Sequence, residues 1–222
     1  VLRDSKSLLD LSPEDFVDEF LMKHLKPKMV VEGDDFNFGS QREGSVETLR
    51  ELGADRGFEV KVIPQKTIAL STGQRVKVSS TIIRYMLESG HVGDAAAALG
   101  RPYRLLERIV RGRGTGRRLG FPTMNMKLPK QIIPAEGVYA GLVNIADEAK
   151  QLYCEAAESP AVFSIGQART FGDSYPLLIE AHLLEEKPDD VTGKWMAMDF
   201  VEHLRTQHKF ESEKNLAEQI QQ

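Results

Sequence analysis

The sequence predicts two domains of different class, an α/β domain over residues 1–101 and a mainly β domain over residues 102–222. Apolar residues in the first part alternate between helical and strand spacing, which is typical of a parallel sheet covered by helices. After Gly100-Arg101-Pro102 the apolar runs become short and are separated by Gly, Pro, Asp and Ser. This second pattern indicates an antiparallel barrel or sandwich, and 222 residues are enough for two modest domains.

Four helices are predicted in the α/β domain. The first begins at Ser12, which can cap a helix, and Pro13, which suits the first helical position. Apolar residues then recur at helical spacing. The other three helices are expected over residues 46–52, 82–87 and 92–99. Gly57 is placed to end the helix that begins at residue 46.

The predicted strands differ between the two halves. In the first half, residues 28–31 form a short apolar run and residues 58–63 alternate with period two, as a half-buried strand does. A C-terminal helix is expected from about Glu211, with Ser212 as its cap. The β-type runs of the second half cover residues 138–140, 161–163, 178–183 and 195–198.

Composition excludes several classes of protein. There are 29 Lys and Arg against 33 Asp and Glu, a formal charge of −4, and 41% of residues are hydrophobic, which argues against disorder. No run approaches the ~18 apolar residues that span a bilayer, and no secretory signal is present, so a cytoplasmic location is expected. The single cysteine, Cys154, excludes an intramolecular disulfide and a cysteine-based zinc site. Because the chain begins with Val1, we expect the natural protein to start earlier.

Residues 111–125 form the most informative stretch. Gly112, Gly114 and Gly116 let backbone amides approach an anion, and arginines such as Arg117 supply charge, so a phosphate cradle is one interpretation. A solvated Arg/Gly turn is the alternative. Nucleic-acid contact is a third, but the acidic balance and the few nearby aromatic residues argue against it. Seven arginines lie within eighteen residues, at positions 101, 104, 108, 111, 113, 117 and 118.

Two oxygen-bearing side chains follow this stretch directly. The Thr123 hydroxyl and the Asn125 carbonyl are hard ligands, suited to a Mg²⁺ ion that keeps several waters and bridges nucleotide phosphates. Residues 116–125, followed by Pro134-Ala135-Glu136-Gly137-Val138-Tyr139-Ala140, resemble riboflavin kinase, and the chain as a whole resembles the bacterial bifunctional riboflavin kinase/FAD synthetases. That resemblance implies a six-stranded antiparallel barrel in which Thr123 and Asn125 bind Mg²⁺ and ATP phosphates.

The resemblance also implies roles on two later strands. The run Ile179-Glu180-Ala181-His182 is similar to the strand that carries the catalytic carboxylate of the family, which makes Glu180 the candidate general base acting on riboflavin. Taken alone, such a Glu is more often an outward-facing strand residue. Leu204-Arg205, with Lys209-Phe210 after it, resembles the segment at the flavin-covering loop, so Arg205 is a candidate flavin contact, although an exposed Arg needs no function.

The first half resembles the same family in two motifs, which implies a partial Rossmann-like nucleotidyltransferase domain. The first, residues 30–39, includes Asp35 and Asn37, candidates to line a flavin pocket. The second is the run Ser79-Ser80-Thr81 with Arg84, whose hydroxyls and guanidinium at a helix N-terminus suit a triphosphate. Ordinary helix capping is the alternative interpretation of this second motif.

The sequence departs from the family pattern in its histidines and in one barrel strand. The five histidines at 24, 91, 182, 203 and 208 form no His-x-Gly-His, the motif on which adenylyl transfer in the family depends. Ser164 and Arg169 stand in a stretch that is usually Asn-Ile-Gly-x-Arg-Pro-Thr, and Val191-Thr192-Gly193 replaces Leu-Tyr-Gly.

The expected function is therefore phosphorylation of riboflavin to FMN by ATP, with FAD formed only by a longer chain. A non-catalytic flavin- or nucleotide-binding module, suggested by Ser164 and Arg169, and an RNA-contacting protein are the alternatives. The expected partners are small-molecule substrates, with no membrane and no nucleic acid, and an oligomer is left open.

Overall fold

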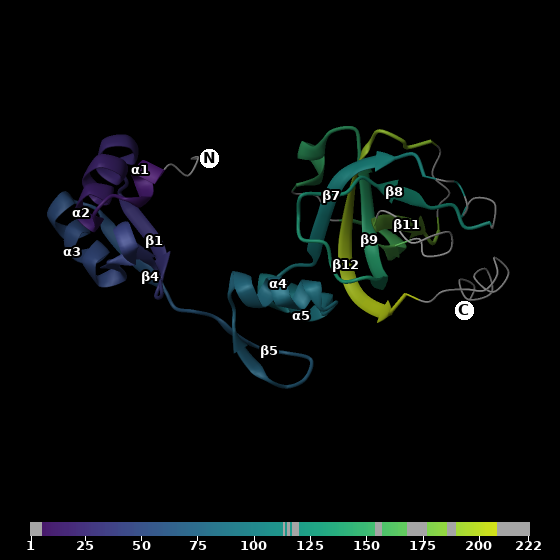
Figure 1. Ribbon diagram of the computed structural model, residues 1–222, viewed down its shortest axis with the longest axis horizontal. Helices are drawn as coiled ribbons and strands as arrows, with labels where there is room; N and C mark the ends of the chain where they lie inside the picture. Colours follow the sequence, from purple (N-terminus) through teal and green to yellow (C-terminus); the bar gives the residue numbers. More distant parts are fainter. Residues whose placement is uncertain are drawn as a thin grey trace. The chain divides into compact units, whose positions relative to one another are not determined.

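The computed structural model describes residues 6–112, 114, 116, 120–153, 157–167, 177–185 and 190–207 (Figure 1). The chain divides into two compact units, Val1–Thr67 and Ile68–Gln222. The predicted C-terminal helix lies outside the described residues. The predicted domain boundary lies near residue 101, whereas the two compact units meet at Thr67 and Ile68. Compact units need not coincide with domains, so the boundary near residue 101 stays a prediction. None of the helices in the described part of the chain is long and apolar enough to cross a membrane.

The first unit contains a parallel pair of strands covered by helices. Strands β1 (Met29–Gly33) and β4 (Glu59–Ile63) pair in parallel, with Val30 opposite Val60. As predicted, Ser12 caps the first helix by accepting the Asp15 amide at 3.1 Å. The remaining elements are α1 (Lys6–Leu9), α2 (Pro13–Asp15), a π-helix η1 (Phe16–Leu25), β2 (Asn37–Phe38), a 3₁₀ turn η2 (Ser40–Arg42), β3 (Gly44–Ser45) and α3 (Val46–Arg56).

The core of this unit lies between the helices and one face of the strand pair. Gly57 ends α3 with φ of 79°, a conformation that glycine adopts without strain, as the sequence predicts. The buried apolar side chains that hold the unit together are Val17, Leu21, Phe38, Leu49, Leu52 and Phe58.

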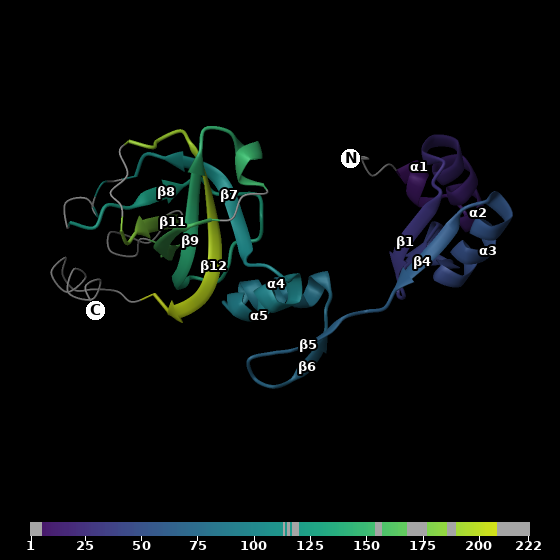
Figure 2. The ribbon, with the colours of Figure 1, turned by 180° about the vertical axis from the view of Figure 1, so that it is seen from behind.

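The second unit begins with a hairpin and two helices. Strands β5 (Thr67–Ala69) and β6 (Arg75–Lys77) form the hairpin (Figure 2). This hairpin is not among the elements predicted from the sequence. Helices α4 (Ser80–Glu88) and α5 (Val92–Leu99) match the predicted pair. Helix α5 contacts β7 and β12 of the barrel that follows, so the helices and the barrel share one core.

The barrel confirms the predicted six-stranded antiparallel class. Its strands close in the order β10-β11-β8-β7-β12-β9, and the barrel pairs that the register describes are antiparallel. A short 3₁₀ helix, η3 (Ala149–Leu152), follows the third strand. The strands are β7 (Tyr103–Val110), β8 (Met124–Met126), β9 (Gly137–Ala146), β10 (Ser159–Gln167), β11 (Leu177–Leu183) and β12 (Trp195–Arg205).

Aromatic side chains fill the barrel interior. Phe200 stands edge-on to both Tyr139 and Phe163, with ring centroids 5.2 and 5.0 Å apart. Gly141 makes room for this packing, because a Cβ there would lie 2.2 Å from the Phe163 ring. Alternate residues of each strand face this core, so the residues between them face outward.

Candidate active site

A row of paired residues crosses the outer face of the barrel and collects several of the predicted site residues. Paired residues of neighbouring strands project to the same face. Ile179 and Ala181, the neighbours of Glu180 on β11, are buried, so Glu180 faces outward with its row. Successive pairs in the row are Arg205 with Val138, Val138 with Ser164, Ser164 with Glu180, Glu180 with Asn125, and Asn125 with Val110.

Glu180 and Thr123 contact each other directly. The Thr123 hydroxyl donates to Oε1 of Glu180 at 3.2 Å, across 57 residues of sequence. Thr123 immediately precedes β8, and Asn125 on β8 lies opposite Glu180 in the register. The barrel thereby places two oxygen-bearing side chains next to a partly buried carboxylate.

Two of the three predicted loop glycines pack against this group. A Cβ on Gly112 would lie 2.2 Å from Nδ2 of Asn125, and one on Gly116 would lie 2.4 Å from the Phe121 carbonyl oxygen and 3.2 Å from Oγ1 of Thr123. Only glycine permits such close approach of backbone to side chain. Gly114 is exposed and has φ of 74°.

Arg117 lies outside the described residues, and two other arginines of the cluster are engaged within the fold. Arg104 forms an ion pair with Asp199, and Arg108 lies 4.8 Å from the centre of the Trp195 ring. Arg108 also donates to the carbonyl of Gly193 at 2.6 Å. Arg104 and Arg108 are therefore held by contacts within the barrel.

His182 also lies at the site, a residue for which the sequence motifs predict no role. Its Nδ1 lies 2.9 Å from the carbonyl oxygen of Pro122, and its ring meets the Phe121 ring edge-on at 5.7 Å. The available sequence signal is its position two residues after Glu180, which places both side chains on one face of a strand.

The donor set fits a magnesium ion. Hydroxyl, amide and carboxylate oxygens are the ligands that Mg²⁺ takes, usually with water and phosphate oxygens completing the shell. Thr123 and Asn125 carry one oxygen donor group each, and the Glu180 carboxylate lies beside them. Among the described residues, no cluster of three or more His, Cys, Asp or Glu could hold a metal ion. A metal at this site would therefore depend on the neutral oxygens of Thr123 and Asn125.

Arg205 lies at one end of the outer row, and Ser164 lies near its middle, opposite Glu180. Arg205 donates from Nη1 to the carbonyl of Thr206 at 3.1 Å. The Gln207 side chain donates to Oγ of Ser164 at 2.8 Å, so it lies over the middle of the row. Lys209, Phe210 and Arg169 lie outside the described residues.

The predicted triphosphate motif begins α4. Ser79 is the N-cap, and its hydroxyl accepts the Ile82 amide at 3.3 Å, which is the capping interpretation in its simplest form. Nη1 of Arg84 lies 3.5 Å from Oγ of Ser80, and both side chains are exposed, as is Thr81. These four residues belong to the second compact unit.

Asp35 and Asn37 belong to the first compact unit and lie together there. The Asn37 side-chain amide donates to the Asp35 carbonyl oxygen at 2.9 Å and so fixes the turn before β2. Burial raises the pKa of Glu32, which lies on β1 just before this turn.

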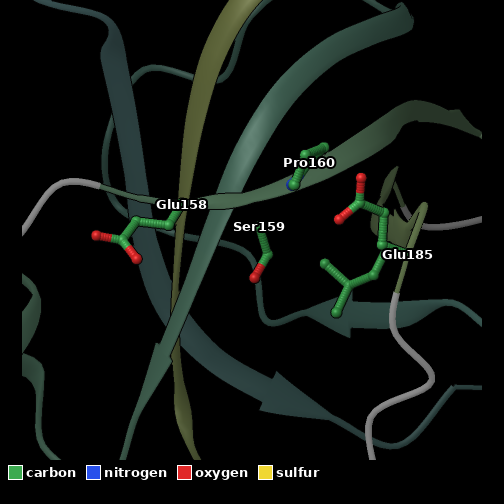
Figure 3. A pocket seen from close by; sticks show the side chains of 5 residues that line it. Glu158, Ser159, Pro160 and Glu185 are labelled. Carbon is green, nitrogen blue, oxygen red and sulfur yellow. The ribbon is translucent and has the colours of Figure 1, made fainter.

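A small pocket elsewhere on the barrel contains none of the predicted site residues. Its volume is about 170 Å³, and it is lined by Glu158, Ser159, Pro160, Leu183 and Glu185 (Figure 3). Figure 3 shows the Glu158 side chain pointing away from the others. Glu158 and Glu185 both carry negative charge, and like charges repel, so these two side chains disfavour a phosphate group in the pocket.

Two family models match different parts of the chain. Residues 99–222 match the family model described as riboflavin kinase, and residues 1–82 match the one described as FAD synthetase. The bifunctional riboflavin kinase/FMN adenylyltransferase of Escherichia coli (strain K12) is 33% identical over 219 residues, covering 99% of this chain and 65% of that protein. The protein of that name from Buchnera aphidicola (subsp. Acyrthosiphon pisum, strain APS) is 32% identical, covering 98% and 66%.

A solved structure also matches nearly the whole of this chain. One described as a macrolide-efflux protein from Streptococcus pneumoniae is 27% identical, with a TM-score of 0.77, and the match covers 98% of this chain and 65% of that one. The chain thus spans just under two thirds of the length of these relatives.

Proposed function

The chain belongs to the riboflavin kinase family, and we propose that it transfers the γ-phosphoryl group of ATP to the 5′-hydroxyl of riboflavin, giving FMN and ADP. The observation that carries the proposal is the contact between Thr123 and Glu180 beside the glycine loop. Phosphoryl transfer needs a positioned base and a place for metal-bound phosphates more than it needs covalent chemistry. This group of residues offers both within one short span of the barrel.

Glu180 is the general base in this proposal. As the bond from the riboflavin 5′-oxygen to phosphorus forms, the hydroxyl proton passes to the Glu180 carboxylate, and ADP leaves with the electrons of the broken bond. Thr123 donates to Oε1 and so restrains the carboxylate without taking its proton-accepting role.

The nucleotide side is assigned to the loop before β8. The backbone of Gly112, Gly114 and Gly116, together with Arg117, would hold the phosphates. Thr123 and Asn125 would hold Mg²⁺, which supplies neutralisation of the phosphate charge when bound. Riboflavin would then lie along the outer row, with Arg205 as its contact at the opposite end from Asn125.

The first 101 residues are assigned to flavin adenylylation in a longer protein. Asp35 and Asn37 would line the flavin pocket, and Ser79, Ser80, Thr81 and Arg84 would hold the triphosphate of ATP. Because the sequence contains no His-x-Gly-His, residues 1–222 are expected to produce FMN but no FAD. Incubation with FMN, ATP and Mg²⁺ tests this, and accumulation of FAD and pyrophosphate would contradict it.

The partners in this proposal are ATP and the flavin alone, with no nucleic acid or membrane involved. Because ATP is the phosphoryl donor, we place the reaction in the cytoplasm.

Chromatographic detection of FMN after incubation with riboflavin, ATP and Mg²⁺ tests the proposal. We expect FMN to accumulate with Mg²⁺ and to stop forming in excess EDTA. Turnover that continues in EDTA would refute the metal assignment. Riboflavin binding without FMN would instead favour the non-catalytic module, and salt-sensitive RNA binding without flavin preference would favour the RNA-contacting protein.

A further inference from the structure

We propose that His182 is a positioning residue that holds Phe121, Pro122 and Thr123 (the 121–123 segment) against β11, so that the Thr123 hydroxyl stays beside Glu180. The inference rests on the proposed function, since Glu180 and Thr123 matter as catalytic and metal-binding groups. Its geometric part, that His182 anchors the segment, can be tested without any turnover.

The need for an anchor follows from where the β-ladder stops. Strand β8 pairs with β11 only from Met126 to Met124, and the last pair in that direction is Met124 with Ala181. Pro122 carries no N–H, so it cannot donate to a continued ladder. Its carbonyl oxygen is the backbone group that remains available, and that oxygen lies 2.9 Å from Nδ1 of His182.

Two side chains of β11 therefore replace the missing backbone pairs. Glu180 and His182 stand two residues apart on one face of the strand, where they contact Thr123 and Pro122 respectively. Because the Pro122 carbonyl can only accept, Nδ1 of His182 must carry the hydrogen. The Phe121 ring, 5.7 Å away and inclined at 75°, limits rotation of the imidazole.

The same segment is tied to the glycine loop. The Phe121 amide donates to the carbonyl of Gly116 at 2.9 Å. Displacement of Pro122 would therefore move the loop residue proposed to hold phosphate as well as Thr123. We assign His182 no contact with ATP or riboflavin and place it on the segment that carries Thr123, so we expect its loss to alter use of ATP more than binding of riboflavin.

Replacement of His182 by Asn and by Gln provides a matched pair of variants. The Asn side-chain nitrogen is as many bonds from Cα as Nδ1 of histidine, whereas the Gln nitrogen is one atom farther and corresponds to Nε2. His182→Asn should retain the bond to Pro122, and His182→Gln should lose it. Both variants are polar and suit a partly exposed strand position, so their thermal midpoints should be similar.

The kinetic readout is kcat/KM for ATP beside the dissociation constant for riboflavin. We expect His182→Gln to lower kcat/KM for ATP by roughly 10- to 100-fold, the scale on which small misplacements act. His182→Asn should stay within about threefold of the natural protein, and riboflavin affinity should change little in either variant. Equal loss in both variants, or no loss in His182→Gln, would overturn the inference.

Hydrogen exchange supplies the readout that is independent of turnover. The Phe121 amide, which donates to the Gly116 carbonyl, should exchange faster in His182→Gln than in the natural protein. In His182→Asn it should exchange at the natural rate. The Ile109 amide, bonded to Lys194 within the barrel, serves as the reference. Unchanged Phe121 exchange in His182→Gln would show that His182 is not the anchor. If the natural protein forms no FMN, the proposed function is refuted. The exchange rates of the Phe121 amide in the two variants would still decide whether His182 anchors the 121–123 segment.

Discussion

We expect Asp199→Ala to destabilise the barrel strongly, because it leaves the partly buried Arg104 guanidinium without its carboxylate. The pair is bidentate, with Nε to Oδ1 at 2.6 Å and Nη2 to Oδ2 at 2.5 Å, and its side chains are only 17% and 9% exposed. Arg104 also donates to the carbonyl of Leu152 on η3. Three parts of the barrel, β7, β12 and η3, therefore meet at this one ion pair.

The magnitude follows from this burial. Removing one member of a buried pair costs about 3–5 kcal/mol, because the remaining charge stays out of water. In a unit of this size, each kcal/mol lowers the thermal midpoint by roughly 2–4 °C. The expected fall for Asp199→Ala is therefore roughly 6–20 °C. Replacing both partners with apolar residues, as in Arg104→Met with Asp199→Leu, should restore most of it, because no unpaired charge is left.

Trp195 fluorescence is the natural assay. It is the single tryptophan and lies on β12, so it reports unfolding of the second unit. Asp147→Ala is the matched control: Asp147 also forms an ion pair, with Lys194 of the same unit at 3.2 Å, but its side chain is 79% exposed. Exposed pairs contribute little, so the Trp195 transition should not move. An Asp199→Ala midpoint within about 2 °C of the natural protein would refute the reasoning.

Three further predictions concern the site and the core. Thr123→Ala should lower the rate more than the affinity for riboflavin, as measured by steady-state kinetics and flavin titration, whereas equal effects on both would contradict its nucleotide-side role. Gly116→Ala should raise KM for ATP, because its Cβ would lie 2.4 Å from the Phe121 carbonyl oxygen, while Gly93→Ala, whose Cβ meets only an ordinary contact at 3.8 Å, should not. Burial raises the pKa of Tyr139 to about 12, so stability present below pH ~10 should fall as pH rises toward 12. Alkaline thermal unfolding should show a shallower fall in Tyr139→Phe, and an identical fall would exclude this phenol as the cause.

Local signals predict four helices of the first 101 residues and half of the twelve described strands. Ser12 and Gly57 act through their own backbone neighbourhood, and the structure confirms both as helix ends. Strand β7 is not predicted, although Leu105 and Ile109 face the core, because the adjacent apolar pairs Leu105-Leu106 and Ile109-Val110 break a strict period of two. Strand β8 is three residues long, too short for periodicity to show.

Long-range partners are what the sequence pattern cannot supply. Arg104 looks like part of a basic cluster until the fold pairs it with Asp199, 95 residues away. Nothing in the sequence pattern indicates that Thr123 and Glu180 are in contact, because that contact depends on the register of β8 against β11. The resemblance to riboflavin kinase identifies both residues as candidates. His182 can be identified as part of the site only from its hydrogen bond to Pro122 in the structure.

The turnover number of Glu180→Gln tests the central claim most directly. Gln is nearly isosteric and lies in the same outward row, so folding should survive, which the Trp195 transition can verify. With saturating riboflavin, ATP and Mg²⁺, we expect FMN formation to slow by a factor of ~10²–10⁴, the usual effect of losing a general base. A folded Glu180→Gln protein that turns over at nearly the natural rate would contradict the assignment and return Glu180 to an ordinary outward-facing strand residue.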